Sequence, residues 1–311
     1  PASGSSFTST FTPTYVLSEV LSALTYGSSS NTQNITLNRA LKVAGPITVD
    51  GGTITLGSSL QSTASAASVI LRAKGSITNT ALTTITTNGG NVLLASNVDD
   101  ATDNDTTVNG NIYLGLGLNV TTNGGNITLG GGNTSGTAYA LGSLNSSAEG
   151  IRIDSSMSLN SGGGNIALRG QSYARAVGAG AGAWGVGFYA LATDGLINSG
   201  TGTITSANTT TDAIVLIGKA TGTSGESWAV ESEAALTVTA TATGGGIALK
   251  TSQANTGANY EVVFRGSTSF LAKSGPIQLL GKQDTGISNG YAYLSGPLYL
   301  GSKAGSAVTT S

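Results

Sequence analysis

Apolar and polar residues alternate along this chain in short runs, and many runs open with the same phrase. Two glycines, or a Ser-Gly pair, precede an Ile-x-Leu or Val-x-Leu alternation, which is the pattern of a β-strand with one buried face. The central residues of the phrase are Ile54, Val92, Ile127, Ile166, Ile247 and Ile277, with Ile204 as a looser member. Taken in chain order with Ile204 included, they lie 38, 35, 39, 38, 43 and 30 residues apart. A near-constant step predicts a solenoid in which each repeat stacks its apolar face on the next.

Each repeat contains three predicted strands. The first strand is represented by Ile85, Val120, Met157 and Leu236. It ends at a corner such as Asn88-Gly89-Gly90 or Asn123-Gly124-Gly125, where Asn and Gly supply the positive φ angles that a tight turn demands. The Ile-x-Leu phrase is the second strand. A longer polar segment then leads to the third strand, represented by Val69, Ile112, Ile151, Val230, Val262 and Tyr291.

This pattern predicts an all-β fold, a right-handed parallel β-helix (solenoid) of about seven coils, each of about 38 residues. One corner of each coil carries the variable polar segment. Between residues 196 and 219 the repeat is ambiguous, because Ile204 and the run 214–217 both fit the second strand.

The N-terminal region is predicted to differ from the repeats. Residues 1–14 read as a polar extended arm, and Phe7, Phe11 and the adjacent Tyr15 are candidates for pairing with a neighbouring molecule as an added strand. Residues 15–25 are predicted to form a short capping α-helix, because their apolar residues share one helical face. Those apolar residues are Val16, Leu17, Val20, Leu21 and Leu24. Residues 15–311 are then a single β-solenoid domain whose helix covers strand edges that a bare end would expose.

Composition narrows the classes of function. The net charge is −2, only 9% of residues are charged, and no basic cluster occurs, so binding to nucleic acid is not expected. No apolar stretch approaches the roughly 20 residues of a membrane helix, so membrane insertion is not expected either. Cys and His are both absent, which excludes disulfides and thiolate or imidazole metal ligands.

Two Gly-rich phrases carry a resemblance to a known family. Residues 123–132 read Asn-Gly-Gly-Asn-Ile-Thr-Leu-Gly-Gly-Gly, and residues 161–170 read Ser-Gly-Gly-Gly-Asn-Ile-Ala-Leu-Arg-Gly. With the lead-in at residues 17–24 and 34–37, they resemble the β-helical repeats of the filamentous haemagglutinin family, large bacterial exoproteins exported by two-partner secretion. The likeness covers about residues 15–249. It implies a bacterial protein, extracellular or on the cell surface, that is adhesive or structural and has no active site to carry over.

Acidic residues are scattered except for one dense run. Within it, Asp99, Asp100, Asp103 and Asp105 are candidate calcium ligands, because closely spaced carboxylates offer the oxygen ligands that Ca²⁺ binds. The alternative is an exposed acidic loop without a metal, and no other cofactor is expected.

Two further groups of acids are candidates for polysaccharide cleavage, which needs two acids, or an acid and a base, held across the scissile bond. Asp154 lies beside Arg152, and Glu231 and Glu233 lie beside Trp228. Solvated, outward-facing carboxylates are the favoured interpretation. The chain is therefore predicted not to be an enzyme.

Aromatic residues gather between the second and third strands of successive repeats. Because equivalent positions stack in a solenoid, these residues are predicted to form a stripe down one side. Its members are Tyr139, Tyr173, Trp184, Phe188, Tyr189, Trp228, Tyr260, Tyr291 and Tyr293. Such a stripe suits subunit packing or stacking against sugar rings, and a satellite core formed by folded-back loops is the alternative.

The expected function is that of an extracellular structural or adhesive β-helix that self-associates into a filament or surface fibre through its ends, arm and aromatic loops. The alternative is a surface β-helix that binds carbohydrate or, less favoured, degrades it. The expected partners are further copies of the chain and surface glycans. Thr-rich runs at residues 83–87 and 237–243 also suggest ice binding, but Ile, Val, Leu and Ser interrupt the regular Thr-x-Thr that this function needs.

Overall fold

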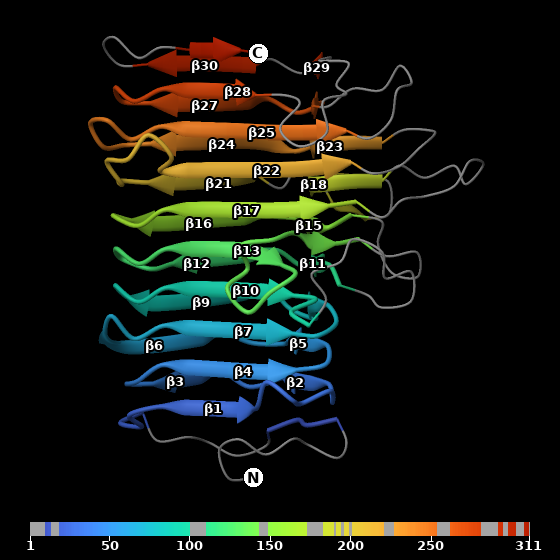
Figure 1. The fold of residues 1–311 in the computed structure, drawn as a ribbon, viewed down its shortest axis with the longest axis vertical. Coiled ribbons are helices and arrows are strands. Elements are labelled where there is room, and N and C mark those ends of the chain that lie inside the picture. Colours follow the sequence, from blue (N-terminus) through green and yellow to red (C-terminus); the bar gives the residue numbers. More distant parts are fainter. Residues whose placement is uncertain are drawn as a thin grey trace, which may run out of the picture.

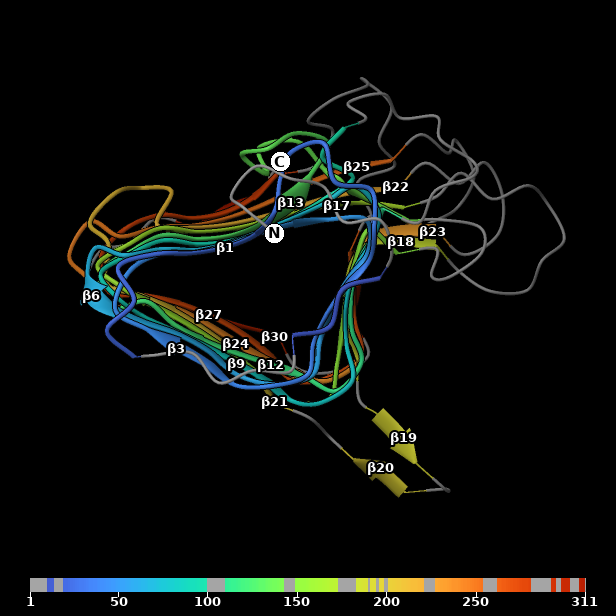
Figure 2. The same ribbon diagram turned by 90° about the horizontal axis from the view of Figure 1, so that it is seen from below.

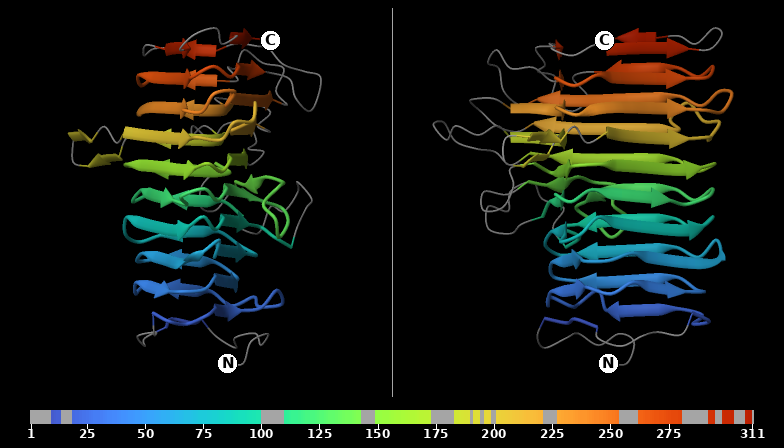
Figure 3. Two further views of the ribbon diagram at one scale, coloured as in Figure 1. Left: turned by 90° about the vertical axis from the view of Figure 1, so that its left-hand side faces the viewer. Right: turned by 180° about the vertical axis from the view of Figure 1, so that it is seen from behind.

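The chain winds into a parallel β-helix, seen from the side in Figure 1 and along its axis in Figure 2. This computed structural model describes residues 10–13, 19–99, 110–142, 149–172, 183–189, 191–193, 196–198, 201–220, 227–253, 262–280, 292–294, 298–302 and 308–310. Three all-parallel sheets run along the stack, and successive coils form its layers (Figure 3). The predicted all-β class and parallel β-helical architecture are confirmed.

We call the three sheets I, II and III. Sheet I has 11 strands: β1 (Leu24–Gly27), β4 (Ile47–Gly51), β7 (Val69–Ala73), β10 (Val92–Ser96), β13 (Ile127–Gly131), β14 (Ala140–Leu141), β17 (Ile166–Gln171), β22 (Ile214–Ala220), β25 (Ile247–Gln253), β28 (Ile277–Leu280) and β31 (Val308–Thr310). Sheet II has nine: β2 (Ile35–Leu37), β5 (Ile54–Leu56), β8 (Ile77–Asn79), β11 (Ile112–Leu114), β15 (Ile151–Asp154), β18 (Ala183–Tyr189), β23 (Ser227–Ser232), β26 (Val262–Phe264) and β29 (Ala292–Leu294). Sheet III also has nine: β3 (Leu41–Val43), β6 (Leu60–Ser65), β9 (Thr83–Asn88), β12 (Leu118–Thr121), β16 (Met157–Gly162), β21 (Thr201–Ser206), β24 (Ala235–Ala240), β27 (Thr268–Ala272) and β30 (Leu298–Ser302). A separate antiparallel pair, β19 (Leu191–Thr193) and β20 (Leu196–Asn198), projects from the stack (Figures 2 and 3).

The interior consists of columns of apolar side chains. In sheet I, Val92, Ile127 and Ile166 are direct partners on successive coils, and each is at most 1% exposed. Alternate residues of a strand point to opposite faces. In-register parallel pairing therefore places inward residues on inward residues, and outward residues on outward residues, from coil to coil. The same pairing fixes which residues line each outer face.

The corner between sheets III and I confirms the predicted role of Asn and Gly. Asn123 has φ of 54°, and Gly89 has φ of 80°, in the left-handed region that a tight turn requires. The next Asn of each corner also links the coils, because the Asn126 N–H donates to Asn91 Oδ1 and the Asn165 N–H donates to Asn126 Oδ1, both at 2.8 Å.

Buried hydroxyls line the inside of the same corner. Ser161 Oγ donates to the Gly164 carbonyl at 2.6 Å, and Ser206 Oγ on the next coil donates to the same carbonyl at 2.7 Å. Satisfied polar groups of this kind avoid the desolvation cost of burying an unpaired hydroxyl. Hydrogen bonds from buried Ser hydroxyls on the inner side and to Asn side chains on the outer side therefore both stabilise the corner.

The coils are more numerous and less uniform than predicted. Sheets II and III hold nine strands each, so the expected seven coils were too few. Near the N-terminus one coil takes 22 residues, from Asp50 to its partner Arg72, whereas 39 residues separate Asn126 from Asn165. The early coils are short because a tight corner takes the place of the long variable segment.

Because the coils differ in length, the sequence prediction assigned two strands to the wrong position in the coil. Ile54 carries the second-strand phrase but pairs with Ile35 and Ile77 in sheet II. Val69, predicted to be a third strand, instead pairs with Ile47 and Val92 in sheet I. From Val92 onward the second-strand members Ile127, Ile166, Ile247 and Ile277 all lie in sheet I.

The ambiguous stretch is also resolved. Ile214 pairs with Ile166 and Ile247 in sheet I, so the second strand of this coil is β22. Ile204 lies in sheet III, between Leu159 and Val238.

The predicted capping helix at residues 15–25 is wrong over its described part. Glu19 and Val20 form a turn, Val20 is 82% exposed, and Leu24 begins strand β1. The reason is tertiary pairing, because Leu24 gains a parallel partner in Ile47 that overrides its local helical pattern. Among the described residues, no helix is long and apolar enough to cross a membrane.

The close contact at the Asn-Gly-Gly corner generates a prediction. A Cβ on Gly125 would overlap the carbonyl oxygen of Gly90, whereas a Cβ on Gly163 would be no closer than 4.0 Å to any neighbour. We expect Gly125→Ala to lower the free energy of unfolding by at least about 2 kcal/mol, because backbone atoms of two coils must separate. Gly163→Ala is the matched control and should stay within about 0.5 kcal/mol of the parent in urea unfolding. Equal stability of the two variants would contradict this account of the corner.

Candidate functional site

The outer face of sheet III carries a two-column array of small, uncharged polar side chains. The two outward positions on β9, β12, β16, β21 and β24 are in register across all five strands. We call this array the Thr-rich face; its members are Thr84, Thr86, Asn119, Thr121, Ser158, Asn160, Thr203, Thr205, Thr237 and Thr239. All are partly or fully exposed, whereas the residues between them point into the core.

Most polar groups of the Thr-rich face have no partner within the described chain. Asn160 Oδ1 accepts the Gly162 N–H at 3.0 Å, and Thr203 Oγ1 makes a long contact of 3.5 Å with the Met157 carbonyl. The other members make no side-chain hydrogen bond to any described residue. β-Branched Thr has few χ1 rotamers, so these hydroxyls are held in a fixed array that is open to water or to a ligand.

The other two outer faces are different. On sheet I, the segment after β13 folds back over the sheet, where Gly131 bridges to Ala138 and Gly136 lies beside Leu93 (Figure 2). On sheet II, the corresponding outward column contains Tyr113, Arg152 and Glu231, which take part in ion pairs and polar contacts. Sheet III thus presents the most regular uncharged surface among the described residues.

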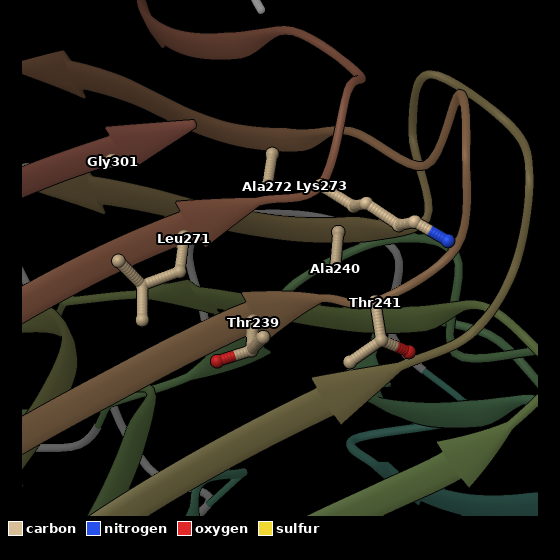
Figure 4. A pocket seen from close by; sticks show the side chains of 7 residues that line it. All are labelled: Thr239, Ala240, Thr241, Leu271, Ala272, Lys273 and Gly301. Atoms are coloured by element: carbon tan, nitrogen blue, oxygen red, sulfur yellow. The ribbon is translucent and has the colours of Figure 1, made fainter. Parts of the chain in front are cut away.

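A hollow of about 520 Å³ lies at the C-terminal end of the Thr-rich face (Figure 4). Its lining includes Thr239, Thr241, Leu271, Lys273 and Gly301, with Ala240 and Ala272 between them. Thr239, Leu271 and Gly301 are partners in one outward column of β24, β27 and β30. The hollow is therefore a continuation of the same face.

The residues around the hollow combine apolar and polar chemistry. Leu271 is 37% exposed, and Tyr299, the outward residue two positions before Gly301, is 56% exposed. Gly301 leaves room beside the leucine, because a Cβ there would lie 2.9 Å from Leu271 Cδ2. Hollows of this size, lined by apolar side chains and a few polar groups, are typical of small-molecule sites.

The predicted aromatic stripe is distributed over more than one register position. Trp184 and Trp228 are direct backbone partners on neighbouring coils, in agreement with the expected stacking of equivalent positions. Phe188 pairs with Ser232, and Tyr293 pairs with Val263 in a different column.

The remaining members of the stripe are placed as follows. Tyr189 pairs with Asp154 in sheet II, whereas Tyr139 lies near sheet I, with Lys219 Nζ 5.7 Å from its ring centre. Tyr173, Tyr260 and Tyr291 lie outside the described residues. The stripe as an interaction surface stays a prediction.

The candidate acids at Asp154 belong to an ion cluster around one guanidinium. Arg152 Nε donates to Asp154 Oδ1 at 2.9 Å, and Arg152 Nη1 donates to Glu149 Oε1 at 3.2 Å. The Tyr113 hydroxyl lies 3.3 Å from Asp154 Oδ2, and the guanidinium lies 5.4 Å from the Tyr113 ring centre. Both carboxylates are almost fully buried and bind the same cation, so they are not the pair of free acids that glycoside hydrolysis requires.

The second acid pair is likewise engaged with a cation. Arg265 Nε donates to Glu231 Oε1 at 3.1 Å and lies 3.8 Å from Glu233 Oε1. Glu231 is fully buried. These carboxylates stabilise the outer side of sheet II as an ion pair spanning two coils.

The candidate calcium loop is described only at its first residue. Asp99 forms an exposed ion pair of 3.5 Å with Lys74, and Asp100, Asp103 and Asp105 lie outside the described residues. No group of three or more acidic side chains that could hold a metal occurs within the described part of the chain.

The arm residue Phe11 contacts its own chain. It bridges to Ile35, with its N–H donating to the Asn34 carbonyl at 2.8 Å and its carbonyl accepting the Thr36 N–H at 2.9 Å. Its ring lies 5.2 Å from that of Tyr26. Phe11 therefore extends sheet II by one bridge at the N-terminal edge, while Phe7 and Tyr15 lie outside the described residues.

Sequence reasoning missed the Thr-rich face because it counted Ile, Val and Leu as interruptions. Ile85, Val120 and Val238 occupy the alternate, inward positions, so they do not interrupt the outer array. The alternation of inward and outward residues within each strand of sheet III was the sequence signal that could have revealed this face. Tyr299 and Leu271 were missed because their exposure depends on the register of the last coils.

No protein-family model, no curated protein and no solved structure matches this chain. The comparisons therefore identify no family for it.

Tyr113 provides a pH-dependent test of the ion cluster. Burial and then the negative charge of Asp154 raise the pKa of Tyr113 above its ordinary value of about 10, against the opposing effect of Arg152. Because the pKa of Tyr113 is raised in the folded state, the protonated tyrosine contributes fully to the free energy of unfolding below about pH 10. This contribution is lost as the pH rises through the folded-state pKa of Tyr113.

We expect Tyr113→Phe to reduce the alkaline decline in the free energy of unfolding, measured by urea unfolding at stepped pH above about 10. Tyr299→Phe, at an exposed tyrosine, is the control and should retain the parent profile. An unchanged alkaline profile in Tyr113→Phe would show that this tyrosine is not coupled to the cluster.

Proposed function

We propose that this chain is an extracellular structural and adhesive β-helix that binds an extended, hydroxyl-rich surface, such as a surface polysaccharide, through the Thr-rich face. The observation that supports the proposal is the unbroken array of exposed Thr, Ser and Asn side chains on five successive coils, most of them without a partner in the described chain. The Gly-rich phrases that resemble filamentous haemagglutinin repeats point to the same class of protein.

The chemistry of the face suits a repetitive ligand that is rich in hydroxyl groups. Hydroxyl and amide groups both donate and accept hydrogen bonds, so they match sugar hydroxyls in either direction. Each contact contributes only modestly in water, so useful affinity requires many equivalent contacts along the stack. A rigid array meets that need because it loses little conformational freedom on binding.

Self-association is a second candidate function, favoured by the last coils. Leu294 and Leu300 are 45% and 36% exposed, whereas their partners Phe264 and Phe270 on the coil below are buried. A further β-coil stacked on them would remove this apolar surface from water. End-to-end stacking of copies would supply such a coil and produce a fibre.

A charge placed in the centre of the Thr-rich face tests the adhesive function. We expect the parent protein to co-sediment with insoluble polysaccharides from a panel that includes cellulose, chitin and bacterial cell-wall glycan. Thr205→Lys should weaken binding at least about tenfold, because an ammonium group would have to be desolvated against a neutral surface. Thr55→Lys, at an outward position of sheet II, is the matched control and should bind as the parent does.

Absence of binding to every polysaccharide, or equal binding by the two lysine variants, would refute the adhesive function of this face. Incorporation of the parent protein into growing ice, lost in Thr205→Lys, would instead assign the face to ordered water.

Self-association is tested at the last coil. Leu300→Lys should shift the protein from fibres or oligomers to single particles in electron microscopy and analytical ultracentrifugation, because a charge replaces the apolar contact. Leu116→Lys replaces a leucine of comparable exposure (43%) elsewhere and should assemble as the parent does. Single particles for the parent protein at all concentrations would rule out assembly through this end.

A further inference from the structure

The hollow at the end of the Thr-rich face differs from the array in its charge. Lys273 follows β27 directly and lines the hollow. The outward positions of the sheet III strands from β9 to β30, as far as the structure describes them, carry no charge, and Lys273 lies one position beyond β27. Lys273 forms no ion pair with a described residue. Among the described residues that line the hollow there is no Asp or Glu, so none of them neutralises the ammonium charge.

Apolar groups flank this charge. Leu271 stands between Thr239 and Gly301 in one outward column, and Tyr299 stands beside it in the next column, above Ser269. Figure 4 shows the Thr239, Thr241, Leu271 and Lys273 side chains on the walls of the hollow. An aliphatic side chain, hydroxyls and one cation thus line the hollow, and an exposed aromatic ring lies in the column next to the leucine.

We propose that this hollow binds a carboxylated sugar unit of an acidic polysaccharide whose chain continues along the Thr-rich face. This inference rests on the proposed adhesive function and names its ligand. The Lys273 ammonium pairs with the carboxylate in a charge-assisted hydrogen bond. The Tyr299 ring and Leu271 pack against the apolar face of the sugar ring, and the hydroxyls of Thr239 and Thr241 bind its hydroxyls.

The repeat of the solenoid suits a polymer aligned with its axis. Neighbouring strands lie about 4.8 Å apart, which is close to the length of one sugar residue in an extended chain. Successive sugars would therefore meet successive rows of the Thr-rich face. The hollow fixes the position of the polymer, and the rows extend the contact.

The test compares an acidic polymer with its neutral ester. Isothermal titration of the intact chain with polygalacturonate and with the same polymer fully methyl-esterified separates the carboxylate from the sugar backbone. We expect the acid form to bind at least about tenfold more tightly, a difference typical of a hydrogen bond to a charged group. Lys273→Met, which keeps an unbranched apolar stem, should abolish this difference without weakening binding of the ester.

Two further variants complete the design. Tyr299→Ala should weaken both polymers by about the same factor, because the ring packs against the sugar rather than its charge. Lys250→Met removes a cation from sheet I, outside the hollow, and should leave both affinities unchanged.

The outcomes separate this inference from the proposed function. Equal binding of acid and ester, with binding of the neutral ester lost in Thr205→Lys, overturns the acidic-sugar site and leaves the adhesive face intact. Binding of neither polymer, with no polysaccharide bound in the wider panel, overturns both. Dextran sulfate is the control for simple attraction of a polyanion. If it binds as tightly as polygalacturonate and its binding is unchanged in Tyr299→Ala, the acidic-sugar site is also overturned.

Discussion

In-register parallel pairing between coils is the interaction on which the rest of this structure depends. Each strand pairs with its equivalent one coil below and one coil above, so a residue's place in its strand determines its column along the stack. Apolar residues at alternate positions merge into one continuous core, as Val92, Ile127 and Ile166 do. The residues between them are carried to the outside by the same geometry, and they form equally regular columns there.

The three outer faces show how one scaffold supports different chemistry. Sheet II carries ion pairs that join coils, such as Arg265 with Glu231. Sheet I is partly covered by the chain itself. Sheet III remains open from β9 to β24, and its columns of Thr, Ser and Asn carry no charge there; Lys42 on β3 and Lys273 just after β27 lie beyond the two ends of this array. Because the backbone is the same under all three faces, their differences come from the outward residues and from the corners that cover or expose them.

The fold was largely predictable from sequence, because the period of two and the Asn-Gly corners are local signals. Asn123 and Gly89 adopt the positive φ that their corner requires. What could not be predicted was the register between coils of unequal length. The phrase around Ile54 is locally indistinguishable from the one around Ile127, yet it lies in another sheet because short coils precede it. The Thr-rich face and its hollow depend on that register, so the local sequence patterns pointed to the carboxylates and aromatics instead.

The corner between sheets I and II determines where such a chain can accept inserted residues. Coils of 22 and of 39 residues join the same sheets, and the difference in length is taken up largely at this corner. Loop-closure entropy rises only slowly with loop length, so a longer excursion there costs little stability. This corner is thus a permissive insertion point, where foreign peptides or whole domains can be displayed at defined heights along a rigid rod while the opposite face keeps its spacing.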